Sequence, residues 1–233
     1  MLSGTYAQQS HAIGLITAFE LTDEAGFAKD ADARAILEGL REFYRPTYNL
    51  RFGFDYLLPI QPNWSIRTGL RLAHLGTKTE EIHLRFGSQA DPDNPGMIDP
   101  DLPSGEPFEK VQFTRRSQFF EIPILFRYAK PSDRKWTTSW EGGIATNVHL
   151  RSTTTTILDE QTSNQQNTDS LVEHPVQLSA VVGFGINFAP TRNWTFYTQP
   201  TGRFHFLPTG NTAIRWHWYS VGLEFGVRRT LGS

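Results

Sequence analysis

Cysteine is absent from the 233-residue sequence, so disulfide bonds, a thiolate nucleophile and a cysteine-based zinc site are excluded. A run of about 18 or more apolar residues is also lacking, and we therefore expect no membrane-spanning helix. Neither charge dominates, because 22 Lys and Arg residues oppose 24 Asp and Glu residues, for a net charge of −2. Nucleic-acid-binding proteins carry a basic surface, so we expect no nucleic-acid partner.

Aromatic residues and a strict alternation of apolar and polar side chains are what the sequence has in abundance. From Tyr48 to Leu58, every second side chain is large and apolar, and the residues between them include Arg51, Gly53 and Asp55. This period of two indicates a β-strand with one apolar and one polar face. The pattern occurs in eight segments, which span residues 12–21, 48–58, 64–74, 120–128, 136–151, 176–188, 194–206 and 219–228.

The connections between these segments alternate between short turns and long polar loops. Short turns with Pro, Asn, Asp or Ser join the second strand to the third, the fourth to the fifth and the sixth to the seventh. We expect loops at about residues 22–46, 87–112, 158–174 and 208–212. This asymmetry predicts an all-β, eight-stranded, antiparallel up-and-down transmembrane β-barrel over residues 11–231, with short periplasmic turns, periplasmic termini and long extracellular loops.

Alternation alone does not say which face points outward, and a soluble barrel with an apolar interior is the alternative. The apolar faces carry more large side chains than an eight-stranded barrel can enclose, so we expect them to face lipid. Arginine pairs bidentately with carboxylates where water is scarce, which predicts a charge network that plugs the lumen. The alternative for these charges is the solvated surface of a soluble sandwich. The predicted network comprises Glu20, Arg51, Asp55, Arg67, Arg71, Glu121, Arg127, Glu141, Arg151, Arg203, Glu224 and Arg228.

A tryptophan follows each of the three short turns, in the stretches IQPNWSI, KPSDRKWTT and APTRNWTFY. Trp64, Trp136 and Trp194 therefore begin strands that run in the same direction and lie at one height on the apolar face. This arrangement predicts an aromatic girdle at the periplasmic-side lipid headgroups. The alternative is that each ring covers a turn in a soluble core.

Two other segments have local signals. Residues 1–10 are interpreted as an N-terminal tail or the remnant of a signal peptide. Residues 30–44 place Ile36, Leu37, Leu40 and Phe43 at helical spacing, which predicts one short helix in the first long loop.

The loop at residues 90–110 is acidic and rich in proline. Asp91 and Asp93 have the spacing of a calcium loop, but Pro95 occupies a ligand position and no glutamate closes the motif. We therefore favour a plain surface loop over a calcium site, and we predict no cofactor.

The stretch SQFFEIPILFRYAK, at residues 117–130, resembles the fourth strand of the outer-membrane β-barrel family common in Bacteroidota, the PorT-like or OmpA-like single-domain barrels. The closing WYSVGLEFGVRRTL, at residues 218–231, resembles the final strand of such barrels. The resemblance extends loosely over the whole chain. It implies a multi-pass protein of the bacterial outer membrane whose partners are outer-membrane lipid and other outer-membrane proteins.

For function, we expect a non-enzymatic barrel that acts in structure or interaction, such as a small subunit of an envelope or secretion complex. A lipid-A-modifying enzyme is one alternative, because His149 and His205 point to the lumen, although no serine lies at a spacing that indicates a nucleophile pair. A small gated pore is the other, although a lumen filled by arginines and carboxylates leaves little passage.

Overall fold

The computed structural model describes residues 11–31, 34, 37–38, 44–79, 82–84, 109–130, 134–158, 162–167, 174–208 and 214–231. Within this part of the chain, no helix is long and apolar enough to cross a membrane. The described strands are β1 (Ala12–Ala28), β2 (Tyr44–Arg45), β3 (Thr47–Gln61), β4 (Trp64–Thr79), β5 (Ile82–Leu84), β6 (Glu109–Ala129), β7 (Trp136–Leu158), β8 (Thr162–Asn167), β9 (Val176–Phe188), β10 (Trp194–His205) and β11 (Ile214–Thr230).

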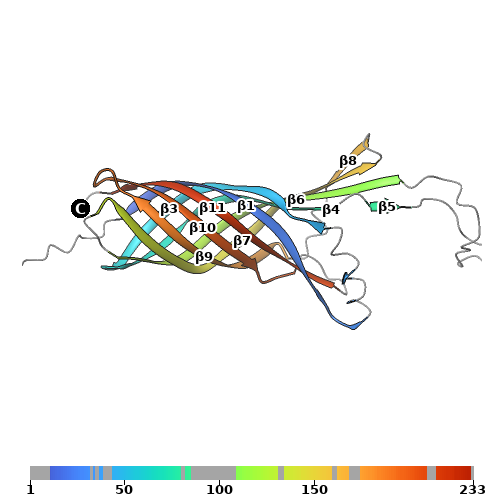
Figure 1. The fold of residues 1–233 in the computed structure, drawn as a ribbon, viewed down its shortest axis with the longest axis horizontal. Coiled ribbons are helices and arrows are strands. Elements are labelled where there is room, and N and C mark those ends of the chain that lie inside the picture. Colours follow the sequence, from blue (N-terminus) through green and yellow to red (C-terminus); the bar gives the residue numbers. More distant parts are fainter. Residues whose placement is uncertain are drawn as a thin grey trace, which may run out of the picture.

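Eight of these strands close into a ring (Figure 1). The order round the ring is β1, β3, β4, β6, β7, β9, β10 and β11, and β11 pairs with β1. All these pairs are antiparallel, and strands that follow one another along the chain are neighbours in the ring. The predicted eight-stranded, up-and-down β-barrel is therefore confirmed. A closed ring has no edge, so the backbone donors and acceptors are satisfied within it.

The three remaining strands extend the barrel at one end. β2 pairs with β4, β5 with β6 and β8 with β7. In Figure 1, this end lies opposite the C-terminus, and β6, β7 and β8 project beyond the barrel. Parts of residues 22–46, 87–112 and 158–174, predicted as loops, are therefore paired strands. They lack apolar alternation because strand pairing uses the backbone and needs no apolar face outside the barrel wall.

The short turns lie together at the other end of the barrel. Backbone hydrogen bonds connect them round this rim: Ala129 donates to Asn63 at 2.9 Å, Ala189 to Lys135 at 2.8 Å and Thr230 to Asn193 at 2.8 Å. The described chain also begins and ends here, since the amide of Leu231 donates to the carbonyl of His11 at 2.7 Å. Short turns thus occupy one rim and long connections the other.

Side chains in the ring alternate between the outside and the interior. On β3, Arg51 and Asp55 are 1% and 3% exposed, whereas Phe52 and Phe54 are 46% and 66% exposed. Successive side chains of a strand point to opposite faces, and the same division recurs round the ring. The apolar face is therefore the outer wall, which is the reverse of a soluble barrel.

The structure describes four residues of the predicted loop helix, and all four have helical backbone: Ala31, Arg34, Leu37 and Glu38. Leu37 packs against Ala28 and Trp216 at the barrel rim. The other apolar positions of the predicted helix, together with residues 1–10, lie outside the described residues.

Candidate functional site: the closed interior of the barrel

The interior collects eleven of the twelve charged residues predicted for the network. All eleven are buried, and the most exposed of them, Arg127, reaches 8%. They comprise five carboxylates and six arginines, so the charges nearly balance within the barrel. These residues are Glu20, Arg51, Asp55, Arg67, Arg71, Glu121, Arg127, Glu141, Arg203, Glu224 and Arg228.

Arg67, on β4, joins carboxylates from three other strands. Its Nε donates to Asp55 Oδ2 at 2.6 Å and its Nη1 to Glu141 Oε1 at 2.5 Å. Its Nη2 donates to Glu224. These carboxylates belong to β3, β7 and β11, so one planar guanidinium with five donors connects much of the ring.

Tyr197 completes this layer from the opposite wall, because β10 lies four positions from β4 in the ring of eight. Its hydroxyl accepts a hydrogen bond from Arg67 Nη2 at 2.9 Å. The same hydroxyl lies 3.1 Å from Asp55 Oδ2 and 3.0 Å from Glu224 Oε1. Arg228 covers the face of the ring, with its Cζ 3.8 Å from the ring centroid. Side chains therefore span the lumen from wall to wall.

A second charged layer lies nearer the loop end and centres on Glu121. Glu121 Oε2 accepts from Arg203 Nη1 at 2.8 Å and lies 3.2 Å from Arg51 Nε. Glu20 pairs with Arg51, and its Oε1 lies 3.2 Å from Arg203 Nε. Each of these four residues has partners on more than one strand, so the layer closes the cross-section again.

Arg71 links the two layers. Its Nη2 donates to Asp55 Oδ1 at 2.9 Å, and its Nη1 lies 3.4 Å from Glu121 Oε1. Removing one partner from a buried ion pair leaves an uncompensated charge in a medium of low dielectric constant. Ion pairs therefore connect nine of these charges into one unit, Arg228 lies 3.9 Å from Asp55 at its border, and Arg127 donates to Asn187 at 3.1 Å.

An apolar cluster closes the interior on the loop side of the charges. The ring centroids of Phe119 and Trp218 lie 5.6 Å apart in an edge-to-face arrangement, and the indole Nε1 of Trp218 donates to Glu24. Both rings are almost fully buried. The cluster comprises Ala73, Leu75, Phe119 and Trp218.

This apolar cluster is absent from the sequence-based prediction, although the sequence contains a signal for it. Phe119 lies two residues before Glu121, and Trp218 lies two residues before Ser220. Extending the period of two by one step at these strand ends places both aromatic residues inside.

Both histidines considered for an enzyme face the interior. His149 Nε2 lies 2.7 Å from Ser152 Oγ, which lies 2.7 Å from Ser117 Oγ, and both serines are buried. His205 is also buried, and neither of its ring nitrogens has a hydrogen-bond partner among the described residues. The two serine hydroxyls and the His205 ring are therefore enclosed within the barrel.

Arg151, predicted to belong to the network, instead points outward. A β-bulge interrupts the alternation on β7, because Phe119 pairs with His149 and Gln118 with Arg151, and Leu150 has no partner. One extra residue in a strand moves every later side chain to the other face. Leu150 and Arg151 are therefore both exposed, and Ser152 takes the inward position.

The three tryptophans that follow the short turns lie on the outer wall beside that rim. Trp64, Trp136 and Trp194 are 45%, 62% and 42% exposed. Two of them have aromatic neighbours: Trp64 lies 5.2 Å from Tyr128 and Trp136 lies 4.6 Å from Phe188, measured between ring centroids. Their common height on the wall fits the headgroup level of a membrane.

A second aromatic group occupies the outer wall near the loop end. His217 stacks on Phe204 with ring centroids 5.8 Å apart and meets the ring of Phe27 edge-on at 5.4 Å. Beside them, the Tyr219 hydroxyl donates to Asp23 Oδ2 at 2.9 Å. Amphipathic rings thus lie towards both ends of the apolar wall, as at the two interfaces of a membrane barrel.

Among the described residues, no group of three or more His, Asp or Glu side chains is placed to hold a metal ion. The acidic loop considered for calcium, residues 90–110, lies almost wholly outside the described residues.

A closed eight-stranded barrel with an apolar outer wall, aromatic residues towards both rims and a charged interior belongs to the class of outer-membrane β-barrels. The chain is a member of the outer membrane protein beta-barrel domain family, whose profile matches residues 7–206. It is therefore a bacterial outer-membrane protein.

The structure is similar to several solved outer-membrane barrels. Neisserial surface protein A has 11% identity and a TM-score of 0.41, over 94% of this chain and 99% of that one. OprG from Pseudomonas aeruginosa has 7% identity and a TM-score of 0.42, over 98% and 99%. The outer membrane protease OmpT from Escherichia coli has 9% identity and a TM-score of 0.42, over 97% and 98%. Similarity at this level carries no conclusion about function, and none of the curated proteins matches the sequence.

Proposed function

We propose that the protein is a non-enzymatic barrel that acts in structure or interaction, through its outer wall and its loop end. The closed interior is the observation that carries this proposal. Arg67 and Tyr197 meet from opposite walls, a second charged layer surrounds Glu121, and the Phe119–Trp218 cluster lies beyond it. A lumen filled in three successive layers offers no route for a solute.

The loop end supplies a surface suited to a partner. In this proposal the rim with the short turns, where the described chain begins and ends, faces the periplasm, and the loop end faces outward. Among the described strands, β5 and β8 each pair on one side only, and an unpaired strand edge can accept a strand from another protein. The resemblance to PorT-like barrels of Bacteroidota supports a role as a small subunit of an envelope or secretion complex.

The two alternatives make different demands on the interior. A gated pore needs the ion-paired layers to separate, which exposes several charges at once. A lipid-A-modifying enzyme needs a hydroxyl within reach of lipid, whereas Ser117 and Ser152 are buried beside His149. The interior meets neither of these demands, which favours a barrel that acts in structure or interaction.

The decisive experiment is extraction from native membranes in mild detergent, followed by identification of co-purifying proteins and by planar-bilayer recording of the purified barrel. We expect a stoichiometric partner and no discrete conductance. Conductance steps that change in Glu121→Gln would favour the pore, and lipid A modification that disappears in His149→Ala would favour the enzyme. Either result contradicts the proposal.

A further inference from the structure

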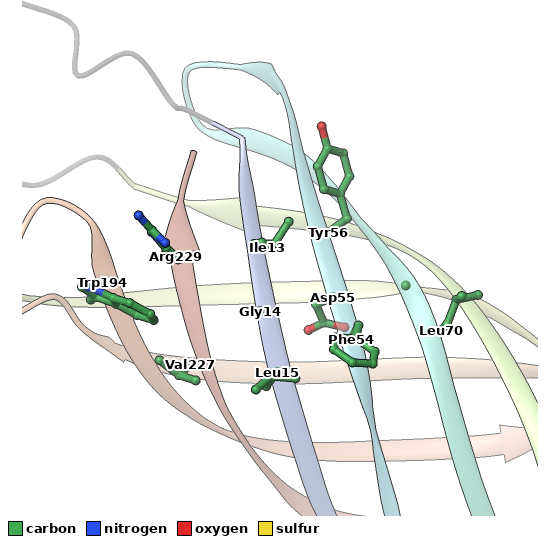
Figure 2. A pocket seen from close by; sticks show the side chains of 11 residues that line it. Ile13, Gly14, Leu15, Phe54, Asp55, Tyr56, Leu70, Trp194, Val227 and Arg229 are labelled. Carbon is green, nitrogen blue, oxygen red and sulfur yellow. The ribbon is translucent and has the colours of Figure 1, made fainter. Parts of the chain in front are cut away.

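Two adjacent rows of outward side chains border a groove on the wall beside the short turns (Figure 2). The row nearer the turns runs through Tyr56, Ile13, Arg229 and Trp194. The next row runs through Leu70, Phe54, Leu15 and Val227. The groove between them has a volume of about 590 Å³, which lies in the range of small-molecule sites.

Backbone forms the floor of this groove, because the residues between the two rows point their side chains inward or have none. Gly14, Asp55 and Gly69 line it and lie side by side on β1, β3 and β4. A second hollow of about 500 Å³ continues along β10, β11 and β1 and shares Leu15 and Val227 with the first. Together they form an extended apolar depression that fits a hydrocarbon chain.

The end of the groove nearest the turns is cationic. Arg229 is exposed and has no ion-pair partner among the described residues, and its Cζ lies 5.9 Å from the ring centroid of Trp194. Trp194 belongs to the aromatic row at the headgroup level of the membrane. A positive charge at headgroup height therefore adjoins an apolar groove in the hydrocarbon region.

We propose that this groove binds a phospholipid with an anionic headgroup, from the leaflet on the short-turn side. The guanidinium of Arg229 binds the phosphate through parallel N–H donors, and an acyl chain lies along Leu15 and Val227. The inference goes beyond the interaction role proposed above and rests on the membrane location of the wall. The lipid site can therefore be wrong while the interaction role holds, and the interaction role can be wrong while the lipid site holds.

A second copy of the barrel fits this surface less well. In a two-fold contact the same patch meets itself, so each copy would bury its own Arg229 in an apolar interface whose lining offers no outward-pointing carboxylate. A buried arginine without a carboxylate is unfavourable in a medium of low dielectric constant. A lipid phosphate neutralises the charge and fills the groove at the same time.

The test uses native mass spectrometry of the detergent-purified barrel, titrated with phosphatidylglycerol or with phosphatidylcholine of the same acyl chains. We expect one retained phosphatidylglycerol per barrel and weaker retention of phosphatidylcholine. Arg229→Gln is expected to lower phosphatidylglycerol occupancy about tenfold, since a hydrogen bond to a charged group is lost. Val227→Trp fills the groove and is expected to lower occupancy by both lipids.

Matched variants on the same wall serve as controls. Arg215→Gln makes the same change of charge at the loop end of β11, and Val182→Trp adds an indole to β9, away from the groove; both are expected to bind as the wild type. Equal phosphatidylglycerol occupancy in Arg229→Gln and Arg215→Gln would overturn the proposal. A purified dimer whose dissociation exposes the groove would also overturn it.

Discussion

Arg67 and Tyr197 meet across the full width of the barrel, with Arg67 Nη2 donating to the Tyr197 hydroxyl at 2.9 Å. Their strands, β4 and β10, lie opposite each other in the ring of eight. A contact between opposite walls is possible only where the lumen is narrow and both side chains are long. It makes the interior a packed core built from charges, where a soluble barrel has an apolar one.

Replacing Arg67 with methionine is expected to destabilise the barrel by about 3–5 kcal/mol, because Asp55, Glu141 and Glu224 lose their shared cation while remaining buried. Urea-induced unfolding in lipid vesicles measures the change. Arg151→Met is the control, since this arginine is exposed, and its effect is expected to stay within about 0.5 kcal/mol. Equal effects of the two substitutions would show that the interior charges are not coupled.

The second charged layer predicts non-additive effects. Glu121 and Arg203 share a hydrogen bond of 2.8 Å and common partners, so Glu121→Gln and Arg203→Gln are each expected to be destabilising. The double variant is expected to cost less than the sum, with a coupling energy of about 1–3 kcal/mol. A double-mutant cycle from unfolding free energies provides the measurement. Strict additivity would contradict the network.

Two adjacent glycines on β7 predict opposite outcomes for the same substitution. A Cβ at Gly143 would lie 2.2 Å from the Ile124 carbonyl oxygen, whereas a Cβ at Gly142 would lie no closer than 3.7 Å to any neighbouring atom. Gly143→Ala is therefore expected to impair folding, and Gly142→Ala to fold as the wild type. The gel mobility shift between folded and heated barrel reports the folded fraction of each, and equal fractions would contradict the register of β6 and β7.

Two substitutions of Trp218 in the apolar cluster are expected to differ in cost, because one removes the packed ring and the other keeps a ring but removes the indole hydrogen bond. Trp218→Ala is expected to cost about 3–5 kcal/mol through the cavity that it leaves against Phe119. Trp218→Phe keeps one ring against Phe119 and loses the indole bond to Glu24 with less buried volume than the alanine variant, at a smaller cost of about 1–2 kcal/mol. Both variants are expected to remain silent in planar bilayers because the charged layers are intact. Conductance in Trp218→Ala alone would show that this cluster is the sole barrier.

The barrel could be predicted from the sequence because lipid on one side and a narrow lumen on the other impose a period of two on every ring strand. On β3, this period alone separates Arg51 and Asp55 from Phe52 and Phe54. Outside the membrane-spanning part of the barrel this constraint is absent, and the strands there cannot be predicted from the period of two. The strand extensions and β8 lie beyond the alternating segments, and their pairing depends on backbone contacts that leave no periodic signal.

Arg151 shows the other limit of sequence reasoning. A bulge of one residue at Leu150 reverses the inward and outward faces of β7, and no residue in that stretch marks the position of the bulge. The ion pairs of the interior could not be predicted from the sequence either. Whether Glu141 and Glu224 reach Arg67 depends on the stagger of strands that lie far apart in the sequence.

The absence of cysteine makes the central claim directly testable by single-cysteine labelling in membranes. We predict that a fluorophore at Phe54→Cys, on the outer wall, is quenched by brominated lipids, and that Thr201→Cys, a buried interior position, resists a membrane-impermeant thiol reagent added to both sides. Quenching of the Phe54→Cys probe by aqueous iodide, together with rapid labelling of Thr201→Cys, would contradict a lipid-facing wall around a closed, charged interior.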